Sequence, residues 1–460
     1  MKNWMLIFGP LAAILFGSVL AGFAFSHEIC ITAAITVWVA AWWITEPISI
    51  PATSLIPLAL FPLFGILSPD EIARAYGNKL VLLMLGGFML SAAMESSGAH
   101  KRIALGMVNL FGRESGRRLV FGFMMASAFL SMWISNAATT LMLLPIAMAV
   151  VAQTSNRNLQ IAILLGIAYG ASVGGVATPI GTPPNLVFMG VYEEATGIEV
   201  GFLDWMKMAL PVVLIMLPIV GFWLTRGIGA IDPIQLPSVG KWRKEEIRTL
   251  IVFGLTALFW VTRQQPFGGW VGVAEGQGIS LNYANDASVA LIGVLVLFAL
   301  PSGEGGKLLD WDTAAKIPWG VLVLFAGGLC LASAFKASGL SEMLGNSISS
   351  LGTLPVLLSI AAICLAVTFL TEVTSNTATT TILLPILVTA AIASEIDPRL
   401  FMIPATISAS FAFMLPVATP PNAIVFGSDK FTVKQMAREG LVLNLVGILI
   451  VTFLKSQVWL

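Results

Sequence analysis

Two short polar motifs each occur twice in this chain of 460 residues, and both lie in strongly apolar sequence. The first motif is Ser-Asn followed by any residue and Ala-Thr-Thr, which begins at Ser135 and again at Ser375. The second is Thr-Pro-Pro-Asn, which begins at Thr182 and again at Thr419. Proline removes a backbone donor and interrupts a helix, and bare backbone at membrane depth is tolerated where it lines a cavity. The oxygens and amides of these motifs suit the binding of sodium ions and of a carboxylate.

The two copies of each motif have a nearly constant separation. Ser135 and Ser375 are 240 residues apart, and Thr182 and Thr419 are 237 residues apart. A single Ser-Asn in a membrane helix is usually a hydrogen bond between helices, and a single Pro-Pro is usually a kink. Four such elements in two matched pairs favour a binding site instead, because broken helices direct amide ends toward anions and carbonyl ends toward small cations. We therefore predict two cation sites beside one shared anion site.

The composition predicts an integral membrane protein. Hydrophobic residues make up 57% of the chain and charged residues only 10%, whereas a soluble domain carries roughly 25% charged residues. The apolar runs are about 20 residues long, which predicts helices, because membrane-spanning strands need only about 10 alternating residues. With a net charge of zero, two histidines and three cysteines in apolar runs, we expect no nucleic-acid partner, no metal cluster and no organic cofactor. No nucleophile or base accompanies the motifs, so an enzyme is not expected.

The apolar runs predict an all-helical membrane protein with about eleven transmembrane helices in two inverted repeats. Each repeat contains a re-entrant hairpin and a broken helix. An odd number of spans separates equivalent positions, which turns the second copy upside down, as in many secondary transporters. The expected parts are an N-terminal helix at 1–28, a first repeat at 29–225 (hairpin near 119–150, broken helix at 159–190), a cytoplasmic linker at 226–248, and a second repeat at 249–460 (hairpin near 351–393, broken helix at 400–427).

The basic residues predict the orientation, because lysine and arginine concentrate in cytoplasmic loops. With a cytoplasmic N-terminus, the loops expected inside are 98–118, 226–248, 302–318 and 428–438. Loop 191–205 carries acidic residues and neither lysine nor arginine, so it is expected outside. Loop 68–79 contains Arg74 and Lys79 and does not follow this rule. The prediction is a multi-pass protein of the plasma (inner) membrane with an external C-terminus.

The stretch from Trp42 to Pro47, both Ser-Asn clusters and both Thr-Pro-Pro-Asn segments resemble the divalent anion/sodium symporters, which carry dicarboxylates, citrate or sulfate. The resemblance covers nearly the whole chain. It implies a homodimer in the lipid bilayer, in which each protomer has a scaffold domain and a transport domain. The Ser-Asn motifs would form the hairpin tips, the Thr-Pro-Pro-Asn segments would lie at unwound helices, and the transport domain would move as an elevator.

The resemblance also implies the binding residues. The first sodium site would use Ser131, Ser135, Asn136 and Gly181. The second would use Thr371, Ser375, Asn376 and Ala418. The substrate would contact Asn136, Ala137, Thr182, Pro183, Asn376, Thr377, Thr419 and Pro420. Glu372 is interpreted as support for the second cluster rather than as a coupling carboxylate, and Glu46 as a residue at the end of a membrane span.

The predicted function is sodium-driven import of a small dicarboxylate such as succinate, malate or fumarate. The family pattern has threonine after both Ser-Asn pairs, but this chain has Ala137 at the first tip, which leaves citrate or sulfate as alternative substrates. Proton coupling, sodium-independent exchange and a channel are further alternatives. The four motif segments contain neither lysine nor arginine, which favours sodium coupling.

Overall fold

The computed structural model describes residues 2–112, 115–229, 234–236, 240–303, 305–348 and 355–458, and in these residues all regular elements are helices. Eight of the described helices are long and apolar enough to cross a membrane, and four further apolar helices are shorter. The predicted all-helical membrane fold is confirmed. The part of the chain before Lys79 contains α1 (Lys2–Gly22), α2 (His27–Thr45), α3 (Ile50–Thr53), α4 (Leu55–Leu63) and α5 (Pro69–Tyr76). The middle of the chain contains α13 (Lys244–Val261), α14 (Gly269–Gly276), α15 (Asp286–Ala299) and α16 (Trp311–Ala314).

The remaining helices form two series with the same order of long and short elements. The first series is α6 (Lys79–Ser97), α7 (Ala99–Phe111), α8 (Gly116–Ser131), α9 (Asn136–Val151), α10 (Arg157–Gly175), α11 (Pro183–Thr196) and α12 (Phe202–Thr225). The second is α17 (Trp319–Ser338), α18 (Leu340–Ile348), α19 (Val356–Thr371), α20 (Asn376–Ala393), α21 (Arg399–Ser410), α22 (Pro420–Phe426) and α23 (Val433–Val458). The repeat predicted from the motifs therefore extends over whole sets of helices. Residues 351–354 of the predicted second hairpin lie outside the described residues.

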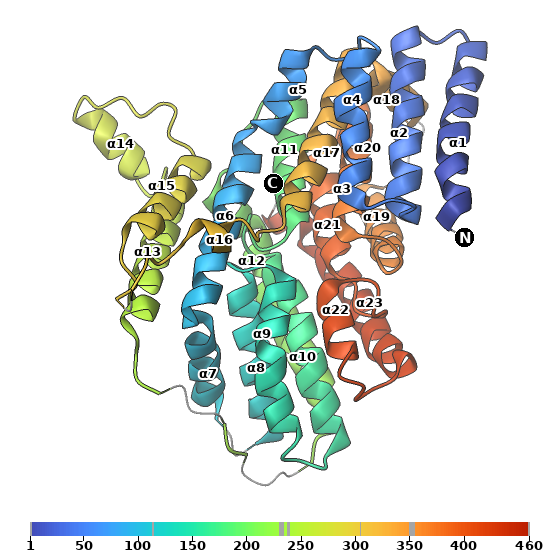
Figure 1. The fold of residues 1–460 in the computed structure, drawn as a ribbon. Coiled ribbons are helices and arrows are strands. Elements are labelled where there is room, and N and C mark those ends of the chain that lie inside the picture. Colours follow the sequence, from blue (N-terminus) through green and yellow to red (C-terminus); the bar gives the residue numbers. More distant parts are fainter. Residues whose placement is uncertain are drawn as a thin grey trace.

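The two series pack against each other reciprocally. Helix α11 of the first packs on α20 and α21 of the second, and α22 of the second packs on the equivalent α9 and α10 of the first. In Figure 1 the chain rises from α10 to α11 but descends from α21 to α22. Equivalent elements thus run in opposite directions, as the prediction of inverted repeats requires.

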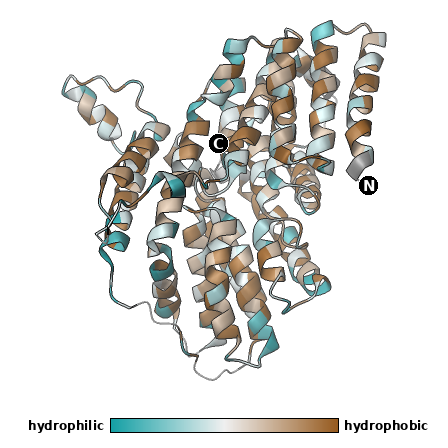
Figure 2. Cartoon of the chain, viewed as in Figure 1, coloured by the Kyte–Doolittle hydropathy of each residue, from teal (hydrophilic) through white to brown (hydrophobic). Residues whose placement is uncertain are grey.

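Apolar side chains cover the outside of the bundle as well as its core. Leu15 of α1 is 67% exposed and Phe222 of α12 is 59% exposed. Figure 2 shows hydrophobic residues along the outer helices, with hydrophilic residues gathered toward helix ends and loops. Such an exterior suits contact with hydrocarbon rather than with water.

Three segments predicted as loops contain whole helices, and one of them, 302–318, includes α16. Residues 98–118 include α7, and 68–79 include α5, whose first turn is closed by a capping box between Ser68 and Glu71. In α7, Arg102 is buried and pairs with Glu246 at 2.9 Å. A buried ion pair allows a segment with basic residues to pack as a helix. The prediction placed loops by their lysine and arginine content, so it could not detect this helix.

The exception to the charge rule, Lys79, has acidic partners. Its ammonium group lies 2.8 Å from Glu193 and 2.8 Å from Glu199, both in the acidic segment 191–205. Arg263 reaches the same Glu199 at 2.9 Å. Burial raises the pKa of Glu199, but the bonds and charges of Lys79 and Arg263 outweigh burial and hold this pKa below its ordinary value. Lys79 therefore belongs to the face that carries the acidic segment.

Candidate functional site

Two helical hairpins bring the Ser-Asn motifs to their tips. Helix α8 ends at Ser131 and α9 begins at Asn136, and α19 and α20 form the equivalent turn in the second series. Ser135 Oγ accepts the N–H of Ala138 at 3.3 Å, and the serine of the second tip makes the equivalent N-terminal cap. Each serine therefore caps the start of the second helix of its hairpin, and the amide end of that helix faces the tip.

Two helix breaks meet the hairpins. Between α10 and α11 the chain is irregular from 176 to 182, and between α21 and α22 it is irregular from 411 to 419. Pro183 and Pro420 occupy the first helical positions after the breaks, where a missing N–H costs nothing. The first break is buried throughout, whereas in the second residues 414–416 are half-buried and Val417 is exposed and lines a cavity, the two settings in which irregular backbone at membrane depth is tolerated.

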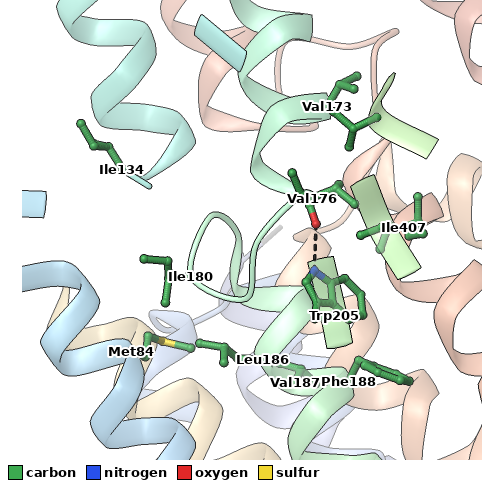
Figure 3. Close-up of a cluster of buried hydrophobic side chains, with 14 of the residues drawn as sticks. Met84, Ile134, Val173, Val176, Ile180, Leu186, Val187, Phe188, Trp205 and Ile407 are labelled. Carbon is green, nitrogen blue, oxygen red and sulfur yellow. Dashed lines mark hydrogen bonds between the residues drawn. The ribbon is translucent and has the colours of Figure 1, made fainter. Parts of the chain in front are cut away.

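The last residue of the first Thr-Pro-Pro-Asn motif holds the break in shape. The side-chain amide of Asn185 donates to the carbonyls of Gly175 at 3.0 Å and Thr178 at 2.7 Å. Figure 3 shows a further bond across this region, from the indole of Trp205 to the carbonyl of Val176, 2.9 Å long. These bonds satisfy carbonyls that the interrupted helix leaves without partners.

Asn422 performs the same task in the second series. Its amide donates to the carbonyls of Ala412 at 2.9 Å and Leu415 at 3.0 Å, which are the positions equivalent to those bonded by Asn185. The sequence analysis assigned no role to either asparagine. The signal that could have found them was their occurrence at the same place in both copies of the motif.

The tips and breaks enclose a cavity of about 740 Å³. Every residue predicted to contact substrate lines it: Asn136, Ala137, Thr182, Pro183, Asn376, Thr377, Thr419 and Pro420. Asn136 and Asn376 were also predicted to bind sodium, and four further predicted sodium-site residues line the cavity, namely Ser135, Gly181, Ser375 and Ala418. Ser131 and Thr371 do not line the cavity and are fully buried behind the tips. The structure thus brings the predicted residues together, from four segments far apart in the chain.

The lining contains no lysine, arginine or histidine among the described residues, and its charged member is Glu46. Glu46 caps α2 in a left-handed conformation, with φ of 47°. The sequence analysis placed it at the end of a span but not in the cavity. A cavity without fixed positive charge can hold an anion through amides, hydroxyls and bound cations.

Oxygen atoms crowd around Asn136 at the first tip. Ser131 Oγ lies 2.6 Å from the side-chain oxygen of Asn136. With the Asn136 amide turned by 180°, its nitrogen instead donates to the carbonyls of Gly181 and Ala171 at 3.2 Å. A Cβ atom placed on Gly181 would lie 2.4 Å from the Gly175 carbonyl oxygen and 2.8 Å from that of Ser131. This concentration of carbonyl, amide and hydroxyl oxygens has the chemistry of a site for a hard cation such as sodium.

The second tip differs in detail. The side-chain oxygen of Asn376 accepts the N–H of Thr377 at 2.7 Å and its hydroxyl at 3.2 Å. The hydroxyl of Thr371 donates to the carbonyl of Ala409 at 2.9 Å. Ala418 occupies the position equivalent to Gly181, so this tip accommodates a Cβ atom that the first tip does not.

Glu372 supports the second break. Its carboxylate accepts the backbone N–H groups of Met414 and Leu415, both at 2.9 Å, and the side-chain amide of Asn444 at 2.7 Å. Tyr169 donates to the carbonyl of Phe413 in the same segment at 2.8 Å. The interpretation of Glu372 as a supporting residue agrees with these contacts.

We expect Glu372→Gln to lower the free energy of unfolding by about 2 kcal/mol, because the new NH₂ group would face donors and leave one of them unpaired in a buried site. The measurement is the midpoint of thermal or denaturant unfolding in detergent. Glu275→Gln, on the exposed α14, is the matched control and should leave the midpoint unchanged. Equal midpoints for the two variants would contradict the supporting role.

The first hairpin tip also packs near α13, a helix that belongs to neither of the two series. The indole of Trp133 stacks on Phe202 of α12 with ring centroids 6.2 Å apart and meets Phe253 of α13 edge-on at 5.7 Å. Phe202 in turn stacks on Trp260 of α13 at 4.7 Å. The position of the tip is therefore linked to α13 through aromatic packing.

Comparison with known proteins gives one family over nearly the whole chain. The family described as the sodium:sulfate symporter transmembrane region matches residues 6–460. The sodium-dependent dicarboxylate transporter SdcS of Staphylococcus saprophyticus is 38% identical over 471 residues, covering 97% of this chain and 89% of that protein. SdcS of Staphylococcus aureus is 38% identical over 443 residues, covering 91% of this chain and 84% of that protein.

Two solved structures share the fold at low sequence identity. The YdaH transporter of Alcanivorax borkumensis superimposes with a TM-score of 0.61 at 14% identity, covering 94% of this chain and 99% of that one. MtrF of Neisseria gonorrhoeae, described among antimetabolite efflux pumps, gives a TM-score of 0.61 at 15% identity and covers 94% of each chain. These names describe transporters rather than enzymes.

Proposed function

Because this chain belongs to the sodium:sulfate symporter family, and is thus a multi-pass membrane transporter, we propose that it couples sodium entry to the import of a small dicarboxylate. The observation that carries the proposal is the single cavity of about 740 Å³ in which both hairpin tips and both helix breaks meet. The name of the SdcS relatives, which are 38% identical, supports both the coupling ion and the substrate class.

In the proposed mechanism, sodium at each tip organises the donors that hold the substrate. The first ion would lie among the oxygens of Ser131, Ser135, Asn136 and Gly181, and the second among those of Thr371, Ser375, Asn376 and Ala418. Asn136 and Asn376 would turn toward the carboxylates, which would also meet Thr377 and the amide ends at Thr182-Pro183 and Thr419-Pro420. Since the residues described in the cavity lining include no lysine, arginine or histidine, the anion would bind well only when the cations are present.

We further propose that the protein is a homodimer of the plasma membrane with a cytoplasmic N-terminus and an external C-terminus. Helices α8–α12 and α19–α23 would form the transport domain, and the remaining helices the scaffold. The transport domain would slide along the scaffold, with the aromatic contact between Trp133 and α13 remade at each step. An inward current would test net charge movement, because each charge crossing 100 mV gains about 2.3 kcal/mol.

The first test is uptake of labelled succinate into proteoliposomes under an inward sodium gradient, compared with potassium and proton gradients. Uptake that requires sodium is the expected result. Uptake that instead requires succinate inside the vesicles would identify an exchanger. Uptake of sulfate or citrate but not succinate would overturn the dicarboxylate assignment and leave the coupling intact.

Ala137 is expected to tune substrate size. Thr377 at the second tip carries a hydroxyl, whereas Ala137 at the equivalent position leaves space and removes a donor. We expect Ala137→Thr to shift competition several-fold in favour of small dicarboxylates over citrate. Ala149→Thr, on the exposed side of the same helix, is the control. An unchanged competition profile would show that the residue at this position is neutral.

A further inference from the structure

A second cavity, of about 430 Å³, adjoins the substrate cavity. The two share Phe88, Ser135 and Pro318 in their linings, so they meet beside the first hairpin tip. The rest of the second cavity is formed by the second half of α6 and by the segment that contains α16, and these two elements pack together. We call this second cavity the vestibule.

The vestibule lies toward the side predicted to be cytoplasmic. Helix α6 begins at Lys79, which pairs with the acidic segment 191–205 expected outside, and ends at Ser97. Glu95 and Ser96, in its last turn, line the vestibule. The opposite wall comes from residues 313–318, within the loop 302–318 expected inside. The vestibule therefore leads from the substrate cavity toward the cytoplasm in the proposed topology.

Lys316 is held in this wall by the backbone around it. Asp310 caps α16 by accepting the N–H of Thr313 at 2.8 Å. The backbone N–H of Lys316 then donates to the carbonyl of Thr313 at 3.2 Å, and the indole of Trp319 donates to the carbonyl of Ala315 at 2.9 Å. The Lys316 side chain is exposed and forms no ion pair with any residue in the described part of the chain. Hydrogen bonds from Thr313 lower the pKa of the Asp310 carboxyl most, the charge of Lys316 is the smallest of the causes that lower it, and no salt bridge to a described residue neutralises this charge.

The charges that line the two cavities are few. Among the described residues, Lys316 is the single cationic side chain in either lining, and Glu95 is the acidic one in the vestibule. Once sodium has left the tips, the substrate cavity offers a dianion no positive charge. The cationic side chain in the combined lining of the described residues is then that of Lys316, which lines the vestibule together with the hydroxyl-bearing residues Thr313 and Ser96.

We propose that Lys316, with the hydroxyls of Thr313 and Ser96, forms an anion station in the vestibule that receives a carboxylate of the substrate as it leaves the hairpin tips. Glu95 on the other wall repels the same carboxylate and keeps the station weak enough to release it. The station adds an exit step to the proposed transport and rests on the proposed function, because it assumes an anionic substrate.

The test uses two neutralising variants with opposite expected effects. At low ionic strength, Lys316→Gln should raise the cytoplasmic-side KM for succinate about threefold, and Glu95→Gln should lower it by a similar factor. The double variant should return close to wild type. Inverted membrane vesicles give the cytoplasmic-side KM, and right-side-out vesicles give the external KM, which should stay unchanged in all three variants. Raising the ionic strength with choline chloride should shrink both effects, since exposed charges are screened.

Lys307→Gln is the matched control, because Lys307 lies in the same segment, donates to the carbonyl of Ala299 and does not line the vestibule. Shifts of the same sign in the Lys316 and Glu95 variants, no shift in either, or shifts on the external side alone would overturn the station. Failure of the wild-type protein to carry succinate, citrate or sulfate would instead overturn the proposed function, and with it the station.

Discussion

Replacing Gly181 by alanine should reduce sodium-driven uptake at least tenfold. The new Cβ would lie 2.4 Å from the carbonyl oxygen of Gly175 and 2.8 Å from that of Ser131, and both are backbone atoms. Neither can rotate away as a side chain would, so the helix break must shift away from the first hairpin tip. A cation held by oxygens of both segments would lose its geometry. The measurement is initial uptake rate against sodium concentration in proteoliposomes.

The pseudo-symmetry of the fold provides the matched control for this variant. Ala418 occupies the equivalent position in the second series, so Ala418→Gly removes the atom that Gly181→Ala adds. Because Ala418 already fits its tip, its loss should change uptake by less than about threefold, in line with the cost of a small cavity at a partly open site. Similar losses in both variants would show that the crowding around Gly181 is not what limits the first site.

Removing either tip asparagine should abolish coupled uptake while the protein stays folded. Asn136 is the point at which the oxygens of Ser131, Gly181 and Ala171 converge, and Asn376 is its equivalent in the second tip. Each alanine variant removes a side chain proposed to contact both an ion and a carboxylate, so a loss well beyond tenfold, or more than about 1.4 kcal/mol, is expected. The measurement is sodium-driven uptake, with folding checked by gel filtration and thermal unfolding.

Asn158→Ala is the control for these two variants. Its amide donates to the carbonyl of Gly227 at 3.0 Å on the exposed surface, at the start of α10 and thus at the opposite end of that helix from the break. This variant should transport like wild type. Near-normal transport by Asn136→Ala or Asn376→Ala would remove that tip from the proposed site.

Much of the site follows from chemistry confined to a few neighbouring residues. A serine before an apolar run caps a helix, and prolines at the first helical position restart one, so the tips at Ser135 and Ser375 and the breaks before Pro183 and Pro420 were predictable. Their repetition at a nearly constant separation indicated a duplication, and the odd number of spans between the copies indicated its inversion. Composition alone indicated the membrane, because so few charged residues cannot cover a surface in water.

The contacts between distant segments were not predictable in this way. Helix α9 is apolar on all sides, so no periodic pattern shows which face meets the break at Gly181. Arg102 and Glu246 are separated by 144 residues and lie in two segments expected to be loops, and their pairing depends on how those segments pack. The sequence placed Glu46 at the end of a membrane span, and the tertiary structure shows that it also lines the cavity.

The sequence by itself determined that this is a helical membrane protein with two polar motifs that each occur twice, because capping and helix breaking are local properties of the backbone. The tertiary structure alone decided which carbonyls Asn185 and Asn422 hold, which backbone amides Glu372 accepts from, and that a vestibule with Lys316 adjoins the substrate cavity. The physical reason is that the apolar helices of a membrane bundle are nearly uniform in hydrophobicity. Their faces are selected by close packing and by the pairing of a few buried polar groups, which depend on residues hundreds of positions apart.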